Sequence, residues 1–214
     1  EGGNLEKTFI LRTVNEFLSS SKKTKFVFFN EQNKKVFTKK WGLTEQQCLV
    51  VPIGVESQEC RSAGMSQRTI LSVGNLVPFK TYFEHTIRAL GKLKGIYSLK
   101  DVDYHIIGEG PNEQKLHNLA KKLGVEDRVI FHKRIEYKKL QGRLCDARVL
   151  IGSGTIIPEA AILGVPTIIG IENDKAGVTY GHLSDFSGLA YNEDGLDLIK
   201  YKLADKVKSV LQLD

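Results

Sequence analysis

The stretch RVLIGSGTIIPEAAILGVPTIIG, residues 148–170, decides the fold, because it encodes a strand, a turn of small residues, a helix and a second strand. The apolar run from Arg148 to Ile151 predicts the first strand, and Thr167 to Gly170 predicts the second. The segment from Ile157 to Leu163 predicts a short helix between them. Parallel strands need such a crossover, so this stretch indicates neighbouring strands of a parallel sheet.

The turn in this stretch also suits an anionic ligand. Ser153, Gly154 and Thr155 are small, so backbone N–H groups can approach an anion closely. The helix that follows adds about half a positive charge at its N-terminus. Glu159, near the helix start, can accept hydrogen bonds from ribose hydroxyls. The alternative interpretation is an ordinary strand, turn and helix in which Thr155 caps the helix.

Strands and helices alternate through the rest of the chain in the same way. Further strands are expected at Thr69–Val73, Asp103–Ile107 and Val129–Phe131, and further helices at Thr81–Lys94, Asn112–Leu123, Tyr137–Leu144 and Leu196–Leu211. This alternation predicts an α/β fold with a doubly wound, Rossmann-like parallel sheet. Ligands of such sheets bind beyond the carboxyl ends of the strands.

The N-terminal quarter differs from the rest. A helix is expected from Leu5 to Ser19, a strand from Lys25 to Asn30, a helix from Glu31 to Trp41 and a strand from Cys48 to Pro52. Two short strands and two helices bury too little apolar surface to fold alone. We therefore expect residues 1–56 to be the end of another domain with its linker, residues 57–214 to be a ligand-binding domain, and the chain to be a fragment or a dependent subunit.

Composition bounds the class of protein. With 41% hydrophobic and 26% charged residues among 214, the chain is typical of a soluble globular protein, and no apolar run approaches the roughly 20 residues of a membrane span. The three cysteines, Cys48, Cys60 and Cys145, are odd in number and lack paired spacing, so we expect neither disulfides nor a zinc site. They indicate a reducing, cytoplasmic location.

The net charge of +6 favours anionic partners. Short basic groups such as Lys22–Lys23, Lys39–Lys40 and Lys138–Lys139 could contact the inner face of a membrane peripherally, or could be solvated helix faces. No zinc spacing, recognition helix or aromatic-interleaved basic motif is present, so nucleic acid is not an expected partner.

Three glycine-containing turns follow expected strands and converge on one site. They begin at Gly74, Gly108 and Gly152. The first turn ends at Lys80, whose ammonium could stabilise the charge that develops on a departing diphosphate. The alternative for Lys80 is a solvated lysine at a helix start, which the helix dipole slightly disfavours.

These segments resemble a known family. Thr69–Lys80, Tyr104–Pro111 and Leu123–Phe131 are similar to the donor-binding half of group 1 (family 4) glycosyltransferases with the GT-B fold, and Cys48–Val55 is similar to the segment by which that family's chain leaves its acceptor-side domain. The resemblance covers roughly residues 25–170. It implies a two-domain enzyme that moves a sugar from a nucleotide diphosphate donor to an acceptor hydroxyl, in polysaccharide or glycoconjugate synthesis.

The resemblance also assigns roles to residues. Lys80 would contact the diphosphate, Glu159 the ribose, the Gly152–Thr155 turn the phosphates, and the main chain at Arg134–Ile135 the base. Lys80 and Glu159 are thus the expected catalytic residues. The expected donor-binding residues are Gly74, Asn75, Gly108, Gly110, Arg134, Ile135, Gly152, Ser153, Gly154 and Thr155. Neither a metal nor another cofactor is expected, a UDP- or GDP-linked sugar is the expected donor, and a saccharide or lipid-linked molecule is the expected acceptor.

The chain departs from the family at two positions. The family commonly has arginine where this chain has Asn75, and glutamate at the position of Ile151. The Gly-Ser-Gly-Thr turn is more similar to that of inverting GT-B enzymes, such as the transferase that adds N-acetylglucosamine in peptidoglycan synthesis. Retention or inversion at the anomeric carbon therefore stays open, as do two other functions: a GT-B-type nucleotide-sugar epimerase and a non-catalytic donor-binding subunit.

Overall fold

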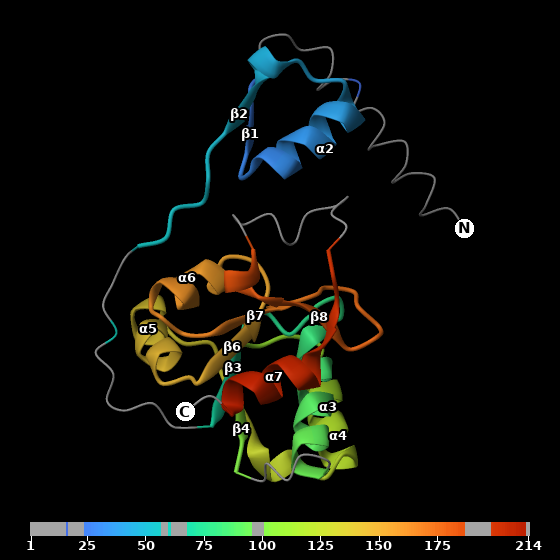
Figure 1. Cartoon of the computed structure of the whole chain (residues 1–214), viewed down its shortest axis with the longest axis vertical. Coiled ribbons are helices and arrows are strands. Elements are labelled where there is room, and N and C mark those ends of the chain that lie inside the picture. The colour runs from blue at the N-terminus through green and yellow to red at the C-terminus, as the bar shows by residue number, and fades with distance from the viewer. Residues whose placement is uncertain are drawn as a thin grey trace. The chain divides into compact units, whose positions relative to one another are not determined.

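The computed structural model describes residue 16 and residues 24–56, 60, 68–95, 101–186 and 198–212. The helix expected from Leu5 to Ser19 lies outside these residues, apart from Glu16. The described residues divide into two compact units, one within Glu1–Gly54 and a larger one within Val55–Asn192 and Leu198–Asp214. Figure 1 shows the elements of both units, and each unit is described by itself.

Within residues 24–54, the first unit has one α-helix beside two parallel strands. Strands β1 (Phe26–Phe28) and β2 (Cys48–Val50) pair in parallel, and helix α2 (Glu31–Trp41) and a 3₁₀ turn (Glu45–Gln47) connect them. The side chain of Asn30 caps α2 by accepting a hydrogen bond from the Asn33 amide at 2.7 Å, and Gly42 ends the helix with a φ of 63°. Both strands are shorter than predicted, whereas the helix bounds are confirmed.

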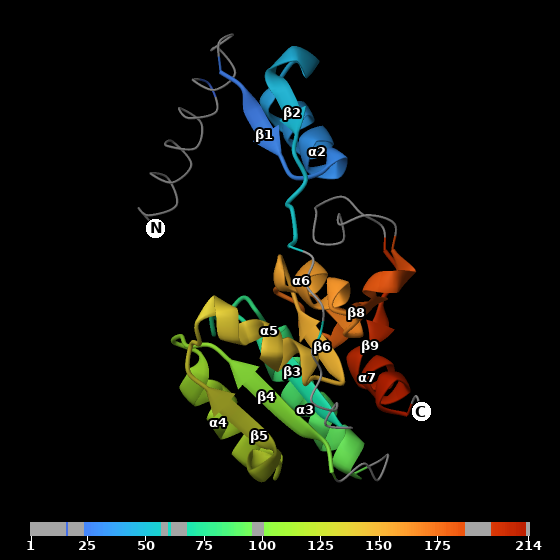
Figure 2. The ribbon, with the colours of Figure 1, turned by 90° about the vertical axis from the view of Figure 1, so that its left-hand side faces the viewer.

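The described residues of the second unit form a seven-stranded sheet between helices (Figure 2). Its strands are β3 (Thr69–Val73), β4 (Asp103–Ile107), β5 (Val129–His132), β6 (Val149–Gly152), β7 (Thr167–Gly170), β8 (Val178–His182) and β9 (Tyr201–Lys202). Its helices are α3 (Tyr82–Gly95), α4 (Glu113–Lys122), α5 (Tyr137–Cys145), α6 (Ile156–Ile162) and α7 (Leu203–Leu211), with 3₁₀ turns at Glu126–Arg128 and Leu183–Asp185.

The strand order is β5-β4-β3-β6-β7-β8-β9, and the first five strands are parallel. The α/β, doubly wound fold class is therefore confirmed. The prediction missed β8 and β9, which pair antiparallel, and the last helix begins at Leu203 rather than Leu196. The connection from β7 to β8 is too short for a helical crossover, so the chain turns back at that edge.

Alternate strand residues build a core on each face of the sheet. Ile70 and Ile151 pack with α3, α4 and α7, whereas the next residue of β3, Leu71, and the preceding residue of β6, Leu150, pack with α5 and α6. Figures 1 and 2 show these helix layers on the two faces. A strand that is buried on both faces shows a continuous apolar run, which explains why the sequence predicted these strands well.

Two turns at the carboxyl ends of β3 and β4 pack backbone against backbone. The Gly74 amide donates to the Ile107 carbonyl, the Leu76 amide to the Glu109 carbonyl, and the Asn112 amide to the Leu76 carbonyl, at 2.9–3.0 Å. A Cβ on Gly108 would overlap the carbonyl oxygen of Gly74. The glycines of the second turn are therefore required because the two chains approach so closely.

The expectation of no disulfide is wrong. Cys60 and Cys145, 85 residues apart in sequence, are bonded to each other, with their Cα atoms 5.6 Å apart. This bond ties the segment before β3 to the last residue of α5. Sequence spacing does not reveal such a pair, because the fold alone brings the two residues together. The cysteine count therefore no longer supports the expected cytoplasmic location.

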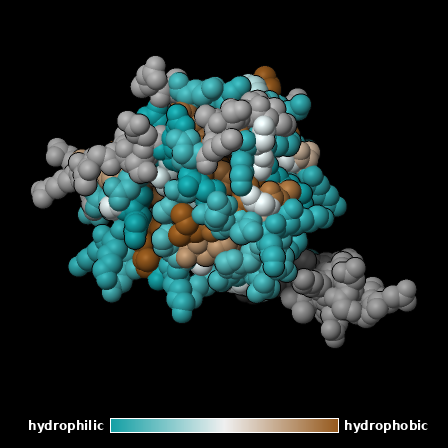
Figure 3. Space-filling model, turned by 90° about the horizontal axis from the view of Figure 1, so that it is seen from below, coloured by the Kyte–Doolittle hydropathy of each residue, from teal (hydrophilic) through white to brown (hydrophobic). Residues whose placement is uncertain are grey.

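In the described part of the chain, no helix is long and apolar enough to cross a membrane. Most of the side chains coloured in Figure 3 are hydrophilic, and the hydrophobic ones form small groups. The same part of the chain holds no group of three or more histidine, cysteine, aspartate or glutamate side chains that could bind a metal ion.

We predict that Gly108→Ala lowers the free energy of unfolding by at least about 2 kcal/mol, because the new Cβ overlaps the Gly74 carbonyl and the φ of Gly108 is +150°. Urea unfolding measures this loss. Gly91→Ala in α3 is the control, since its Cβ would make an ordinary 3.8 Å contact with Leu123 and alanine favours a helix by up to about 1 kcal/mol. Equal stability of the two variants would contradict the packing described.

Two histidines face each other across strands β4 and β5. His132 Nε2 lies 3.1 Å from His105 Nδ1, which forms a hydrogen bond when both rings are neutral. Burial lowers the pKa of both histidines, and for His105 the facing ring lowers the pKa further. The folded state therefore binds fewer protons than the unfolded state below the ordinary histidine pKa of about 6.5.

We expect the melting temperature to fall as the pH drops from 7.5 to 5.5, because stability present above pH of about 6.5 is lost towards the lower folded-state pKa values. His132→Gln should reduce this pH dependence. His117→Gln, at a half-exposed position of α4, should leave it unchanged. A pH dependence that is identical in all three proteins would show that the pair does not titrate as described.

We also predict that the unreduced, unfolded protein exposes one reactive thiol, that of Cys48, and that reduction raises the number to three. Alkylation followed by mass spectrometry counts the thiols. Reduction should lower stability by about 2–4 kcal/mol, since the disulfide closes a long loop. Three thiols before reduction would contradict the bond.

Candidate functional site

The carboxyl ends of β3 and β6 form the switch point of the sheet. From β3 the chain proceeds outward to β4 and β5, and β6 then begins the other half on the opposite side of β3. Ligands of doubly wound sheets bind at this point, because the connections diverge there. Gly74 directly follows β3, and the Gly152–Thr155 turn begins in β6, so both predicted turns lie at the switch point.

Lys80 reaches back over the first turn. Its Nζ atom lies 3.2 Å from the position that a Cβ of Gly74 would occupy, and its amide donates to the Val77 carbonyl at 3.1 Å. The side chain is only partly exposed, and within the described residues it makes no ion pair. The structure thus brings Lys80 and Gly74 together and leaves the ammonium available to an anion.

The other predicted residues of the first two turns have different surroundings. Asn75 is exposed at the tip of its turn. Gly108 and Gly110 pack against the backbone of Gly74 and Leu76, respectively. These two glycines therefore pack against the backbone of the Gly74 turn. A side chain at position 108 or 110 would overlap that backbone.

The Gly152–Thr155 turn leads into α6. Ser153 is buried, and its hydroxyl donates to the Glu172 carboxylate at 2.6 Å. Gly154 has a φ of +75°, with open space where a Cβ would lie. Thr155 makes no side-chain capping hydrogen bond to the described residues, so the alternative of a capping threonine is not what the structure has.

In the first turn of α6 the Ile157 amide donates to the Gly154 carbonyl and the Glu159 amide to the Thr155 carbonyl, both at 3.2 Å. Pro158 has no N–H. The amides of Thr155 and Ile156 are therefore the ones that could face an anion at this helix start.

Glu159 lies in the first turn of α6 and lines a cavity of about 370 Å³ within the second unit. Tyr137, Lys138 and Gln141 of α5 line the same cavity. Burial raises the pKa of Glu159 above its ordinary value. A cavity with this volume and with mixed aromatic and polar walls is suitable for a nucleoside.

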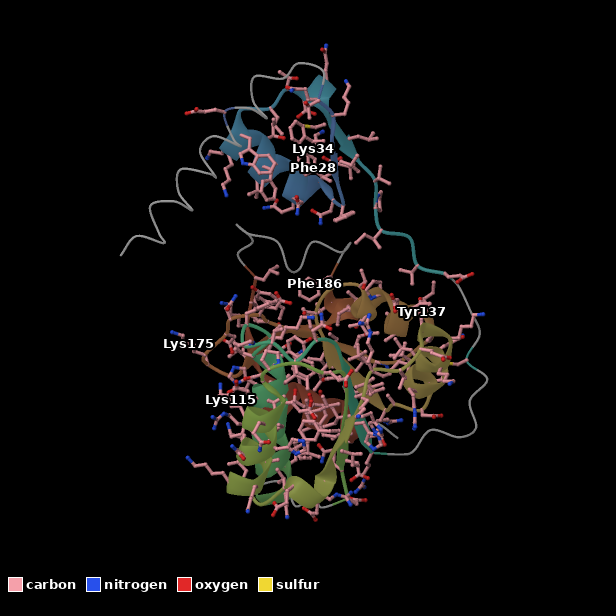
Figure 4. The ribbon with its side chains drawn as sticks, turned by 180° about the vertical axis from the view of Figure 1, so that it is seen from behind. Phe28, Lys34, Lys115, Tyr137, Lys175 and Phe186 are labelled. Atoms are coloured by element: carbon pink, nitrogen blue, oxygen red, sulfur yellow. A yellow bond between two sulfur atoms is a disulfide. The ribbon has the colours of Figure 1, made fainter. Side chains whose placement is uncertain are left out.

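The predicted base-binding residues lie just before this wall. Arg134 is exposed, and Ile135 packs against the core under α5 and α6. Neither side chain lines the cavity, whereas Tyr137, which begins α5 and is 62% exposed, does (Figure 4). Tyr137 could not be recognised from the sequence, because it has the pattern of an ordinary residue at the start of a helix.

Two further residues at the switch point were missed. The Tyr82 hydroxyl is buried 3.5 Å from the Cβ position of Gly74, without a hydrogen-bond partner among the described residues. Burial and the charge of Glu172 raise the pKa of Tyr82, and the nearby Ser153 hydroxyl acts in the opposite direction. Nothing in the sequence distinguishes Tyr82 from its neighbours in the helix predicted over Thr81–Lys94. Glu172 follows β7. It could have been found from the sequence, because ligands of doubly wound sheets bind beyond the carboxyl ends of the strands.

The loop between β7 and β8 is attached to the turn that carries Lys80. The Asn173 amide donates to the Phe79 carbonyl at 2.7 Å, and the Thr81 hydroxyl donates to the Ile171 carbonyl at 3.4 Å. Asp174 accepts hydrogen bonds from three amides of its own loop, and its carboxylate lies 3.3 Å from His85 of α3. These contacts fix both segments relative to each other.

The known proteins to which this chain is similar are glycosyltransferases. A curated, uncharacterized glycosyltransferase from Haemophilus influenzae is 26% identical over 199 residues, which are 89% of this chain and 55% of the relative, so the chain spans about half the length of that protein. A variant of S. aureus TarM, solved with fondaparinux, alpha-GlcNAc-glycerol and UDP, has a TM-score of 0.64 and 18% identity, covering 89% of this chain and 37% of TarM.

The pneumococcal O-GlcNAc transferase GtfA, solved with UDP and GlcNAc, has a TM-score of 0.63 and 17% identity over 92% of this chain and 38% of its own. Identities this low establish the GT-B type of fold and nothing further. The family model of group 1 glycosyl transferases matches residues 58–174, more than half of the chain. This chain therefore belongs to the group 1 glycosyltransferases.

Proposed function

We propose that this chain carries the donor-binding part of an enzyme that transfers a sugar from a nucleotide diphosphate sugar to an acceptor hydroxyl. The observation that carries the proposal is the position of the Lys80 ammonium over Gly74 at the switch point. A cation at this position can bind the diphosphate, and the small turn before α6 lies at the end of the neighbouring strand β6. The Lys80 ammonium and this turn are both suited to stabilise the diphosphate, which is the leaving group.

In the proposed reaction, the acceptor oxygen attacks the anomeric carbon, and the bond between that carbon and the diphosphate oxygen breaks. The electron pair of that bond goes to the diphosphate, and the acceptor hydroxyl loses its proton to a base. Lys80 and the amides at the start of α6 stabilise the charge as it develops on the leaving group. A group of this kind contributes about 10²–10³ in rate in other enzymes.

We further propose that the nucleoside occupies the cavity lined by Glu159 and Tyr137. The Glu159 carboxylate would accept hydrogen bonds from the ribose hydroxyls, and the Tyr137 ring would offer a face to the base. UDP is the first nucleotide to test, because the TarM and GtfA structures contain it. The reaction is proposed to need neither metal nor cofactor, since Lys80 and the helix amides would neutralise the diphosphate.

The proposed acceptor is a saccharide, free or attached to a lipid.

A groove of about 870 Å³ on the second unit is bordered by five cationic side chains, Arg88, Lys92, Lys115, Lys175 and Lys202. Lys115 pairs with Glu84, whereas the other four make no ion pair among the described residues. Figure 4 shows Lys115 and Lys175 on the same side of this unit, opposite Tyr137. Such a surface suits peripheral contact with an anionic membrane.

We predict that Lys80→Ala weakens UDP binding by at least about tenfold, because a charge-assisted contact to phosphate contributes about 1.5–3 kcal/mol. Thermal shift with UDP, GDP, ADP and TDP selects the nucleotide, since binding raises stability by RT ln(1 + [L]/Kd). Calorimetry with that nucleotide then gives the affinity. Lys121→Ala is the control, because Lys121 is exposed at the end of α4, near the opposite edge of the sheet.

Unchanged nucleotide affinity in Lys80→Ala would remove the basis of the proposal. Conversion of a sugar nucleotide into its isomer, with no acceptor present, would favour the epimerase instead. Transfer of a labelled sugar by this chain alone would exclude a non-catalytic subunit.

A further inference from the structure

We propose that Glu172 determines donor specificity by binding hydroxyl groups of the sugar that the nucleotide carries. This inference rests on the proposed function and assigns a residue to the sugar rather than to the nucleotide. Glu172 follows β7, the strand next to β6, so its backbone leaves the sheet at the same edge as the Ser153 turn and the Gly74 turn.

One carboxylate oxygen of Glu172 is already fixed. Its Oε1 atom accepts the hydrogen bond of the buried Ser153 hydroxyl at 2.6 Å, whereas Oε2 has no partner among the described residues. Glu172 is exposed, and so this second oxygen is open to a ligand. The buried Tyr82 hydroxyl beside Ser153 adds another polar group that is without a partner in the described structure.

The charge of Glu172 indicates which part of the donor it would contact. A carboxylate repels a diphosphate, by several kcal/mol at about 4 Å in an effective dielectric of about 20. Glu172 makes no ion pair to Lys80 or to any other described cation, and its side-chain hydrogen bond is with the Ser153 hydroxyl. In a site that binds a diphosphate, a carboxylate can form favourable contacts only with the uncharged part of the ligand. Sugar hydroxyls are that part, and they donate to carboxylates.

The loop around Glu172 is rigid enough to hold a specific orientation. On one side of Glu172, Ile171 accepts the hydrogen bond of Thr81, and on the other side the Asn173 amide donates to Phe79. Asp174 then accepts hydrogen bonds from three backbone amides, which closes the loop. The loop that carries Glu172 is thus hydrogen-bonded to the residues on either side of Lys80. The two opposite charges are held at neighbouring but separate positions, one for the diphosphate and one for the sugar.

The test compares the affinity for UDP with that for UDP-glucose, UDP-galactose and UDP-N-acetylglucosamine, by calorimetry on the full chain. The wild type should bind at least one UDP-sugar more tightly than it binds UDP. In Glu172→Ala this advantage should fall by about tenfold, while the affinity for UDP itself stays the same or increases, because a repelling charge is gone. Glu172→Gln keeps an acceptor oxygen and should retain part of the advantage.

Glu126→Gln is the matched control, since Glu126 is exposed at the amino end of β5, away from the switch point. An unchanged sugar advantage in Glu172→Ala would overturn the inference while leaving the proposed function intact. Equal loss of UDP and UDP-sugar binding would overturn it as well, because Glu172 would then only support the fold of the site. Failure of the wild-type chain to bind any of UDP, GDP, ADP and TDP would overturn the proposed function and this inference together. If the chain selects GDP, ADP or TDP, the same comparison is made with the sugars of that nucleotide.

Discussion

The close backbone contact between the Gly74 turn and the Gly108 turn is the constraint on which the site depends. Hydrogen bonds from the Gly74 and Leu76 amides to the neighbouring turn fix the first turn above the sheet. Lys80 can fold back over Gly74 because no side chain occupies that position. The glycines of both turns are thus structural requirements, and the ammonium is the chemical group that their packing presents.

Groups of opposite charge lie on neighbouring connections at the carboxyl edge of the sheet. Lys80 comes from the connection after β3, Ser153 from the end of β6 and Glu172 from the end of β7. Parallel strands bring all three to one edge, although 92 residues separate Lys80 from Glu172. Hydrogen bonds between the β7–β8 loop and the Phe79–Thr81 segment then hold the cation and the carboxylate in fixed relation.

Much of the parallel sheet could be predicted because its strands are buried on both faces and show continuous apolar runs. The bounds of Asp103–Ile107 and Thr167–Gly170 were predicted as observed. Strands β8 and β9 could not be predicted in this way, since only alternate residues of β8 are buried and both residues of β9 are exposed. Their pairing depends on tertiary contacts rather than on local pattern.

By itself the sequence determined the alternation of strands and helices, the glycine turns after the strands and the resemblance to sugar-transferring enzymes, because these features are local in the chain. Only the tertiary structure decided which distant groups meet. It paired Cys60 with Cys145, placed Tyr137 and Glu159 in the walls of one cavity, and joined the Glu172 carboxylate to Ser153 by a hydrogen bond. Such contacts follow from strand order and helix packing, which bring together residues that no spacing in the sequence relates.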